Sequence, residues 1–284
     1  MLKMTALNRI MMFKKITYDI LLLLFSRRKK RDFKIVESEY EDYAWFNVEK
    51  NLENFIRSGN SNPAEFLFDF AFPRRSFLAV MEKIRFVDSS EYYRYKANKL
   101  NKLSVFFGDS ILEIGSGFGS NLMALRISGY RGQLFGIDIS DRGVNIANQL
   151  SNYFNLELSI KKQDILKLDM NNTREYQEVN SILIYQVIEQ IPNDVRVFIQ
   201  NLLTLFPSKK FFIIESLAGY KIRNFSELIT SLYIYKQNYQ SNLIDVLIEH
   251  EEIGSIKNLE ITKYKCSHKF GHESALITFD TNKI

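Results

Sequence analysis

Residues 111–120 read ILEIGSGFGS, an apolar run that passes into glycines at every second position and then into a predicted helix. The apolar part, Ser110 to Ile114, is predicted to be a buried strand because it is short and bounded by turn residues. Glycine suits the loop that follows, since the backbone there must turn sharply and let a ligand approach without a Cβ in the way. The pattern therefore predicts a strand, a ligand-binding turn and a helix in direct succession.

The same alternation of strand and helix continues along the chain. Further strands are predicted at 133–138, 157–161, 181–186 and 210–215, and helices at 120–128, 142–153, 171–178 and 194–206. Short β-rich runs that alternate with helical stretches are typical of parallel strands joined by crossover helices.

Two more strands are predicted near the end of the chain. A long helical stretch at 225–250 precedes strands at 259–265 and 274–279, and the connection between these two is too short to hold a crossover helix. They should therefore be antiparallel neighbours. The fold class predicted is α/β, with a Rossmann-like, mostly parallel sheet of seven strands whose last strand is reversed.

Residues 1–90 differ from the rest because they are rich in aromatic and charged residues and show no regular alternation of strand and helix. Breaks are expected at 60–63 and at Phe72-Pro73. We interpret 1–90 as a mainly helical N-terminal extension that covers the ligand-binding edge of the sheet as a lid, and 91–284 as the domain that contains the sheet.

Within the extension, the apolar stretch 16–25 is followed by five basic residues at 27–31. A secretory signal would carry a small-residue cleavage site there, so export is not expected. Two interpretations remain open. The segment is either an interfacial helix on the anionic inner face of a membrane, or an ordinary helix packed on the protein with a solvated basic end.

Composition limits the class of protein. The chain has 284 residues, of which 46% are hydrophobic and 25% charged, so it is long enough for a large globular domain. The single cysteine, Cys266, excludes an intrachain disulfide, and a cytoplasmic location is the default expectation. The net charge of +5 allows an acidic partner, but it does not specify one.

Two acidic residues stand where strands of the predicted sheet end. Asp138 ends the second strand, and a carboxylate there is suited to accept both hydroxyls of a ribose. Asp164 follows the third strand, where it can accept the amine of an adenine while Ile165 packs on the ring. Because open α/β sheets bind ligands at the carboxyl ends of their strands, these acids and the glycine loop are expected to form one site.

With these features the chain resembles the class I S-adenosylmethionine-dependent methyltransferases over about 91–284, and most closely those that modify small molecules. The E-x-G-x-G-x-G signature of that family is matched by Glu113, Gly115, Gly117 and Gly119. The resemblance implies S-adenosylmethionine as the cofactor, with Gln186, Val187 and Glu189 at its methionine end. The complete predicted cofactor site is Glu113, Gly115, Ser116, Gly117, Gly119, Asp138, Ile139, Asp164, Ile165, Gln186 and Val187.

The competing interpretation of the loop is a dinucleotide-binding domain with the fingerprint G-x-G-x-x-G or A. Gly115 and Gly117 fit that fingerprint, but Ser120 occupies its third place. The glutamate before the loop and the two terminal strands favour the methyl donor over a nicotinamide cofactor.

Candidate general bases are Glu189, His268 and His272, with His250 as a further possibility. His268 and His272 lie in the connection between the last two strands, which should reach the cofactor edge of the sheet. No metal site is predicted, since this pair lacks a third ligand and a helix to present both rings on one face. Gln190 stands where many relatives carry a histidine.

The absence of two sequence motifs limits the class of molecule expected to accept the methyl group. The fourth strand is followed by neither Asn nor Asp with two prolines and an aromatic residue, and Cys266 does not follow a proline, so nucleic acid is not expected as substrate. A small molecule, a glycan or a protein side chain remains, and we favour a hydroxyl of a small molecule or envelope glycan. The tyrosine-rich stretches Tyr92-Tyr93-Arg94-Tyr95 and Leu232-Tyr233-Ile234-Tyr235, with Tyr239, either line a substrate pocket and stack on sugars or bases, or pack as helices against the sheet. A non-catalytic binding or regulatory subunit is the alternative.

Overall fold

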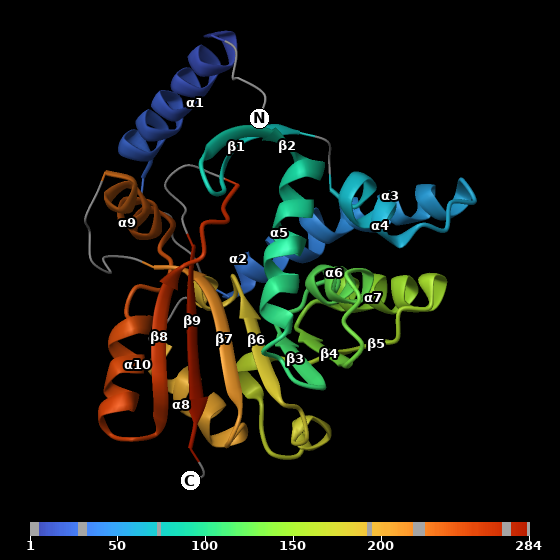
Figure 1. Ribbon diagram of the computed structural model, residues 1–284, viewed down its shortest axis with the longest axis vertical. Coiled ribbons are helices and arrows are strands. Elements are labelled where there is room, and N and C mark those ends of the chain that lie inside the picture. The colour runs from blue at the N-terminus through green and yellow to red at the C-terminus, as the bar shows by residue number, and fades with distance from the viewer. Residues whose placement is uncertain are drawn as a thin grey trace.

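The computed structural model describes residues 6–27, 33–72, 75–191, 195–217, 225–268 and 274–282. Its centre is a seven-stranded sheet in the order β5-β4-β3-β6-β7-β9-β8 (Figure 1). The strands are β3 (Ser110–Ile114), β4 (Gln133–Asp138), β5 (Leu158–Lys162), β6 (Ser181–Tyr185), β7 (Lys210–Ser216), β8 (Ile256–Lys263) and β9 (Ser274–Thr281).

Strand directions follow the predicted topology. β3 is parallel to β4 and β6, and the outer pairs β4–β5 and β6–β7 are also parallel. β9 runs antiparallel to both β7 and β8. The predicted mostly parallel sheet with a reversed last strand is thus confirmed.

Helices cover both faces of the sheet. On one side lie α5 (Ser89–Ser104), α6 (Ser120–Ile127) and α7 (Asp141–Phe154), and on the other lie α8 (Val195–Leu205) and α10 (Leu243–Glu252). Residues of β3 alternate between the two cores, with Ile111 on the first side and Leu112 on the second. A strand buried on both faces is mainly apolar, which explains Ile111, Leu112 and Ile114, while the buried Glu113 between them is hydrogen-bonded to Asn121.

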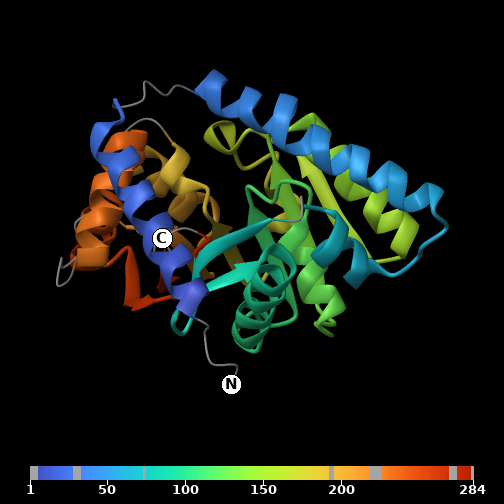
Figure 2. The same cartoon turned by 90° about the horizontal axis from the view of Figure 1, so that it is seen from above.

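The N-terminal extension contains α1 (Ala6–Phe25), α2 (Phe33–Ser38), a π-helical stretch (Glu39–Ala44), α3 (Trp45–Arg57), the single turn α4 (Pro63–Glu65) and a second π-helical stretch (Phe66–Phe70). α3 lies along α7 (Figure 2). The mainly helical character is therefore confirmed, but the region also holds an antiparallel hairpin, β1 (Ser76–Val80) and β2 (Ile84–Asp88), which the sequence did not predict. Among the described residues, no helix is both long and apolar enough to cross a bilayer.

Two helix predictions are wrong. Residues 171–178 form a loop with one 3-10 turn (Arg174–Tyr176), because the Asp169 carboxylate accepts the N–H groups of Asn171 and Asn172 and so favours a turn. The predicted helix 225–250 is interrupted after α9 (Phe225–Gln237), where Asn238 has a φ of +56°. The other predicted strands and helices differ from the structure mainly at their ends.

Candidate cofactor and substrate site

The glycine loop after β3 needs its glycines for two separate reasons. Gly115, Gly117 and Gly119 have φ values of +73°, +55° and +77°, which side chains rarely adopt. A Cβ on Gly115 would lie 2.4 Å from Cγ2 of Val187, and one on Gly119 would lie 2.5 Å from Cδ1 of Ile160. The loop is therefore closely packed, and a methyl group at Gly115 would require the branched side chain of Val187 to move.

Asp138, at the end of β4, joins two loops at this edge of the sheet. Its Oδ2 accepts the N–H of Gly117 at 2.7 Å, and its Oδ1 accepts the N–H of Ser140 at 2.9 Å. Burial raises the pKa of this carboxyl, while the two N–H groups oppose that shift. Because each carboxylate oxygen has two lone pairs, Asp138 can still accept hydrogen bonds from a ligand.

Glu113 lies beneath the loop rather than at its surface. It is fully buried and accepts a hydrogen bond from Nδ2 of Asn121 at 2.6 Å. Burial raises its pKa to about 8, partly offset by the Asn121 hydrogen bond and the charge of Lys96. Its position suits a residue that supports the loop from below.

The carboxyl ends of the strands border a cavity of about 560 Å³, within the range of roughly 300 to 1,000 Å³ typical of small-molecule sites. The predicted residues that line it are Gly115, Ser116, Gly117, Asp138, Ile139, Ile165, Gln186, Val187, Glu189 and His268. The structure thus brings together residues from four strand ends and from the β8–β9 connection.

Other predicted residues are not part of the described cavity wall. Glu113 and Gly119 lie behind it. Asp164 caps the turn that follows it, accepting the N–H of Leu166 at 3.0 Å and pairing with Nζ of Lys167 at 2.9 Å. His250 is buried in α10 away from the cavity, where burial lowers its pKa. His272 lies outside the described residues.

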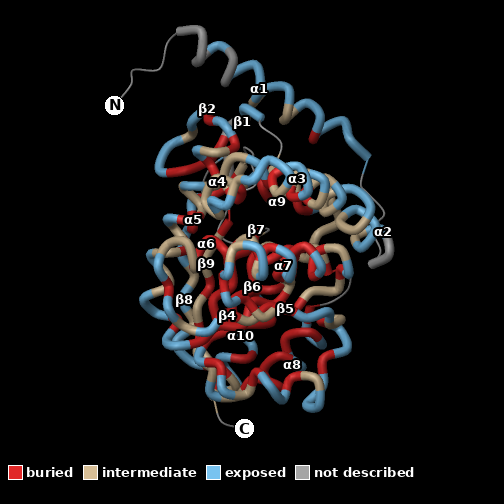
Figure 3. Tube along the Cα trace, turned by 90° about the vertical axis from the view of Figure 1, so that its right-hand side faces the viewer, coloured by how far each residue is buried: buried red, intermediate tan, exposed pale blue. Residues whose placement is uncertain are grey.

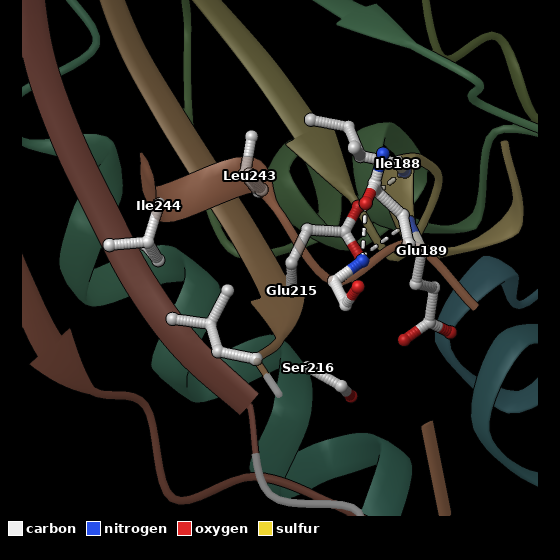
Figure 4. A pocket seen from close by; sticks show the side chains of 9 residues that line it. Ile188, Glu189, Glu215, Ser216, Leu243 and Ile244 are labelled. Carbon is white, nitrogen blue, oxygen red and sulfur yellow. Dashed lines mark hydrogen bonds between the residues drawn. The ribbon is translucent and has the colours of Figure 1, made fainter. Parts of the chain in front are cut away.

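Glu215, at the end of β7, is a positioning residue that the sequence analysis missed. Its Oε1 accepts the N–H of Val187 at 2.6 Å. Oε1 also accepts the N–H of Ile188 at 2.7 Å, and Oε2 accepts that of Glu189 at 3.4 Å (Figure 4). Burial and the neighbouring carboxylate of Glu189 raise its pKa well above the ordinary range. The sequence feature that could have identified Glu215 is an acidic residue at the end of an apolar strand, the same feature that identified Asp138.

A segment of the N-terminal extension closes one side of the cavity, lined there by Val36, Glu37, Tyr40, Ala44 and Trp45. Glu41 fixes this segment, because its carboxylate accepts the hydroxyl of Ser140 and the N–H of Arg142. The ring of Trp45 meets that of Phe118 edge to face at 5.3 Å, next to the glycine loop. These contacts join residues that are between 73 and 101 positions apart, so no local pattern predicted them.

The remaining wall is aromatic. Of the predicted tyrosines, Tyr92, Tyr93, Tyr233 and Tyr239 line the cavity together with Tyr185, whereas Tyr95 and Tyr235 do not. Nζ of Lys96 lies 4.1 Å from the ring centroid of Tyr185, and burial lowers the pKa of this lysine. The His268 ring is half-buried, 6.1 Å from that of Tyr92.

Comparisons with known proteins agree with this geometry. A family model described as "Methyltransferase domain" matches residues 107–263. No curated protein sequence matches the chain significantly.

Among solved structures, the [4+2]-cyclase SpnF is similar with a TM-score of 0.57 at 13% identity, over 90% of this chain and 99% of that one. Magnesium protoporphyrin IX methyltransferase from Synechocystis PCC 6803 with bound SAH gives a TM-score of 0.52 at 13% identity, over 88% and 100%. Such low identities establish a common fold and leave the chemistry to be argued from the site.

Proposed function

This chain belongs to the methyltransferase-domain family, as its class I resemblance predicted, and from that premise we propose that it transfers a methyl group from S-adenosylmethionine to a hydroxyl of a small molecule or glycan. The observation that carries the proposal is the closely packed glycine loop, joined to Asp138 at the wall of a 560 Å³ cavity.

The polar groups of the cavity wall fit such a ligand. Oγ of Ser116 and Oε1 of Gln190 are buried and have no hydrogen-bond partner within the part of the chain that the structure describes. Buried polar atoms are nearly always paired, so these two support a ligand with polar groups of its own. We assign Asp138 to the ribose hydroxyls, Ile139 and Ile165 to the adenine, and Gln186 and Val187 to the methionine end.

S-adenosylmethionine supplies a sulfonium methyl group, whose transfer to a nucleophile relieves the positive charge of the donor. The protein then has to hold the acceptor oxygen in line with that methyl group and keep water out. Residues 1–90 serve as the cover that excludes water, and 91–284 as the methyltransferase domain. The cover is well placed for this role, since Tyr40 and Trp45 line the cavity.

A hydroxyl acceptor must lose its proton as the new bond forms, and a nearby base speeds that step. Glu189 and His268 line the cavity and are the candidates for this role. The tyrosines of the opposite wall suit a ring-shaped acceptor such as a sugar, on which aromatic faces pack well.

Calorimetry tests the cofactor assignment. The wild type should bind both S-adenosylmethionine and its demethylated product. Asp138→Ala should weaken that binding by about 100-fold, because it removes charge-assisted hydrogen bonds worth about 1.5 to 3 kcal/mol each. Asp141→Ala is the matched control, since Asp141 is an acid of the next turn that pairs with Lys162 at the surface and does not line the cavity. Absence of binding by the wild type contradicts the proposal.

Turnover with labelled donor and envelope saccharide fractions tests the acceptor. Glu189→Gln or His268→Gln should lower the rate of methyl transfer by about 100-fold, the usual contribution of a general base. His250→Gln is the control for a histidine outside the cavity. Label found in protein instead of saccharide would assign a protein side chain as acceptor, and donor binding without any labelled product would identify a binding subunit.

A further inference from the structure

α1 presents an apolar surface that the rest of the described protein does not cover. Ile10, Phe13, Leu21, Leu24 and Phe25 are each between 47% and 83% exposed. At 3.6 residues per turn the first four fall within about 80° of the helix circumference, so they form one stripe. Figure 3 shows this helix exposed along nearly its whole described length.

The part of α1 next to this stripe holds the helix on the protein. Leu23 is buried, Ile16 and Ile20 are half-buried, and α1 contacts α9 and β2 (Figure 1). Nζ of Lys236 in α9 donates to the carbonyl of Ser26 at 2.6 Å, just beyond the end of α1. The helix is therefore docked, and its apolar stripe lies beside the contact, about a quarter of the circumference away from it.

α9 repeats this arrangement. Phe225, Leu228 and Tyr235 are between 49% and 58% exposed and also fall within about 80° of the circumference. The other side of α9 is buried through Ile229 and Ile234, and its Tyr233 lines the cavity. We call the exposed stripes of the two helices, with Phe25, the α1–α9 surface.

The charges around this surface are mainly positive. Lys14 and Arg27 are exposed on α1 or directly after it, and the sequence continues with four basic residues at 28–31. The two acids described on these helices are neutralised, Asp19 by Lys15 at 2.7 Å and Glu227 by Lys263. Apolar side chains with a basic border are the pattern of helices that lie in the plane of an anionic lipid surface.

We propose that the α1–α9 surface docks on an anionic lipid bilayer, with α1 lying in the interface. A second copy of the chain is a poorer partner, because a two-fold contact would bring the two basic borders together. Docking would place α9, and with it the cavity wall at Tyr233, next to the lipid, so an acceptor held at a membrane could enter directly. The proposal concerns binding only and does not depend on methyl transfer.

Vesicle cosedimentation of the full chain without cofactor tests it. The protein should bind phosphatidylcholine vesicles containing phosphatidylglycerol and should not bind vesicles of phosphatidylcholine alone. Binding should weaken as salt is added. Lys14→Glu with Arg27→Glu should lower partitioning by at least about tenfold, since each basic residue near the surface contributes about 1 kcal/mol. Phe13→Ser with Leu24→Ser should lower it by a similar factor.

Controls at the opposite end of the molecule keep the test specific. Val197→Ser removes an exposed apolar residue of α8, and Lys257→Glu reverses an exposed charge of β8. Both should bind vesicles as the wild type does, and the α1 variants must keep its circular dichroism spectrum. Equal binding by the α1 variants and the wild type, or no binding to anionic vesicles, overturns the proposal. So does a dimer in solution that these substitutions dissociate.

Discussion

The two walls of the cavity are built differently. In the donor wall, which follows β3, β4 and β6, the backbone of two turns is held by the carboxylates of Glu215 and Asp138. The opposite cover consists of side chains from the N-terminal extension, α5 and α9, among them Trp45, Tyr92 and Tyr233. A backbone wall tolerates almost no substitution, whereas a wall of side chains can be altered residue by residue and so can adapt to different acceptors.

The largest expected effect is on the donor wall. Gly115→Ala should weaken binding of S-adenosylmethionine by at least about 100-fold, because left-handed strain of about 1 to 2 kcal/mol adds to a clash with Val187. Gly59→Ala is the matched control, since Gly59 has the same φ of +73° with no atom within 4 Å of the added Cβ. Calorimetry measures the affinity of both variants for S-adenosylmethionine. An equal loss of affinity in the two would mean that close packing of the loop does not determine cofactor binding.

The buried carboxyl beneath the same wall should make stability depend on pH. The pKa of Glu113 is raised from 4.5 to about 8 in the folded protein, so the folded state keeps a proton that the unfolded chain loses. The free energy of unfolding should therefore fall as pH rises from about 4.5 to about 8. Glu113→Gln should remove most of that fall, which is on the order of 5 kcal/mol at about 1.36 kcal/mol per pKa unit, in urea titrations.

Glu252→Gln, at the exposed end of α10, is the control for this titration and should follow the wild type. Parallel stability curves for Glu113→Gln and the wild type would show that Glu113 titrates alike in the folded and unfolded states.

Substitutions in the cover should have smaller effects on cofactor binding. Trp45→Ala should weaken cofactor binding by about tenfold, because it opens the wall beside Gly117 and admits water. Phe46→Ala, the adjacent but outward-facing aromatic residue, should leave the affinity unchanged. If Trp45→Ala binds as tightly as the wild type, the N-terminal segment is not part of the donor site.

The smallest effect is expected for Glu41, which attaches the cover to the methyltransferase domain. Glu41→Gln should weaken the bonds to Ser140 and Arg142 by about 1 kcal/mol in total, so amides of 36–45 should exchange hydrogen about fivefold faster. Glu53→Gln, an exposed acid on α3 paired with Arg57, should not change that exchange. Unchanged exchange in Glu41→Gln would contradict the anchoring role.

The same contrast explains how far the sequence predicted the molecule. The strands, the glycine loop and Asp138 follow from local patterns, because a strand buried on both faces is mainly apolar and a tight turn needs glycine. Glu215 had an equivalent local signal, the acid that ends an apolar strand, which was overlooked. The contact between Trp45 and the glycine loop had no local signal, because it depends on residues far apart in the sequence. The β1–β2 hairpin also had no signal, because its strands are too short to show a clear period.

The central claim, that the donor nucleoside lies on the glycine loop with its ribose at Asp138, is tested most directly by a crystal structure with S-adenosylhomocysteine at saturating concentration. The account predicts both ribose hydroxyls within hydrogen-bond distance of the Asp138 carboxylate and the nucleoside above Gly115 and Gly117. Density for the ligand elsewhere, or an empty cavity beside Asp138, would contradict it.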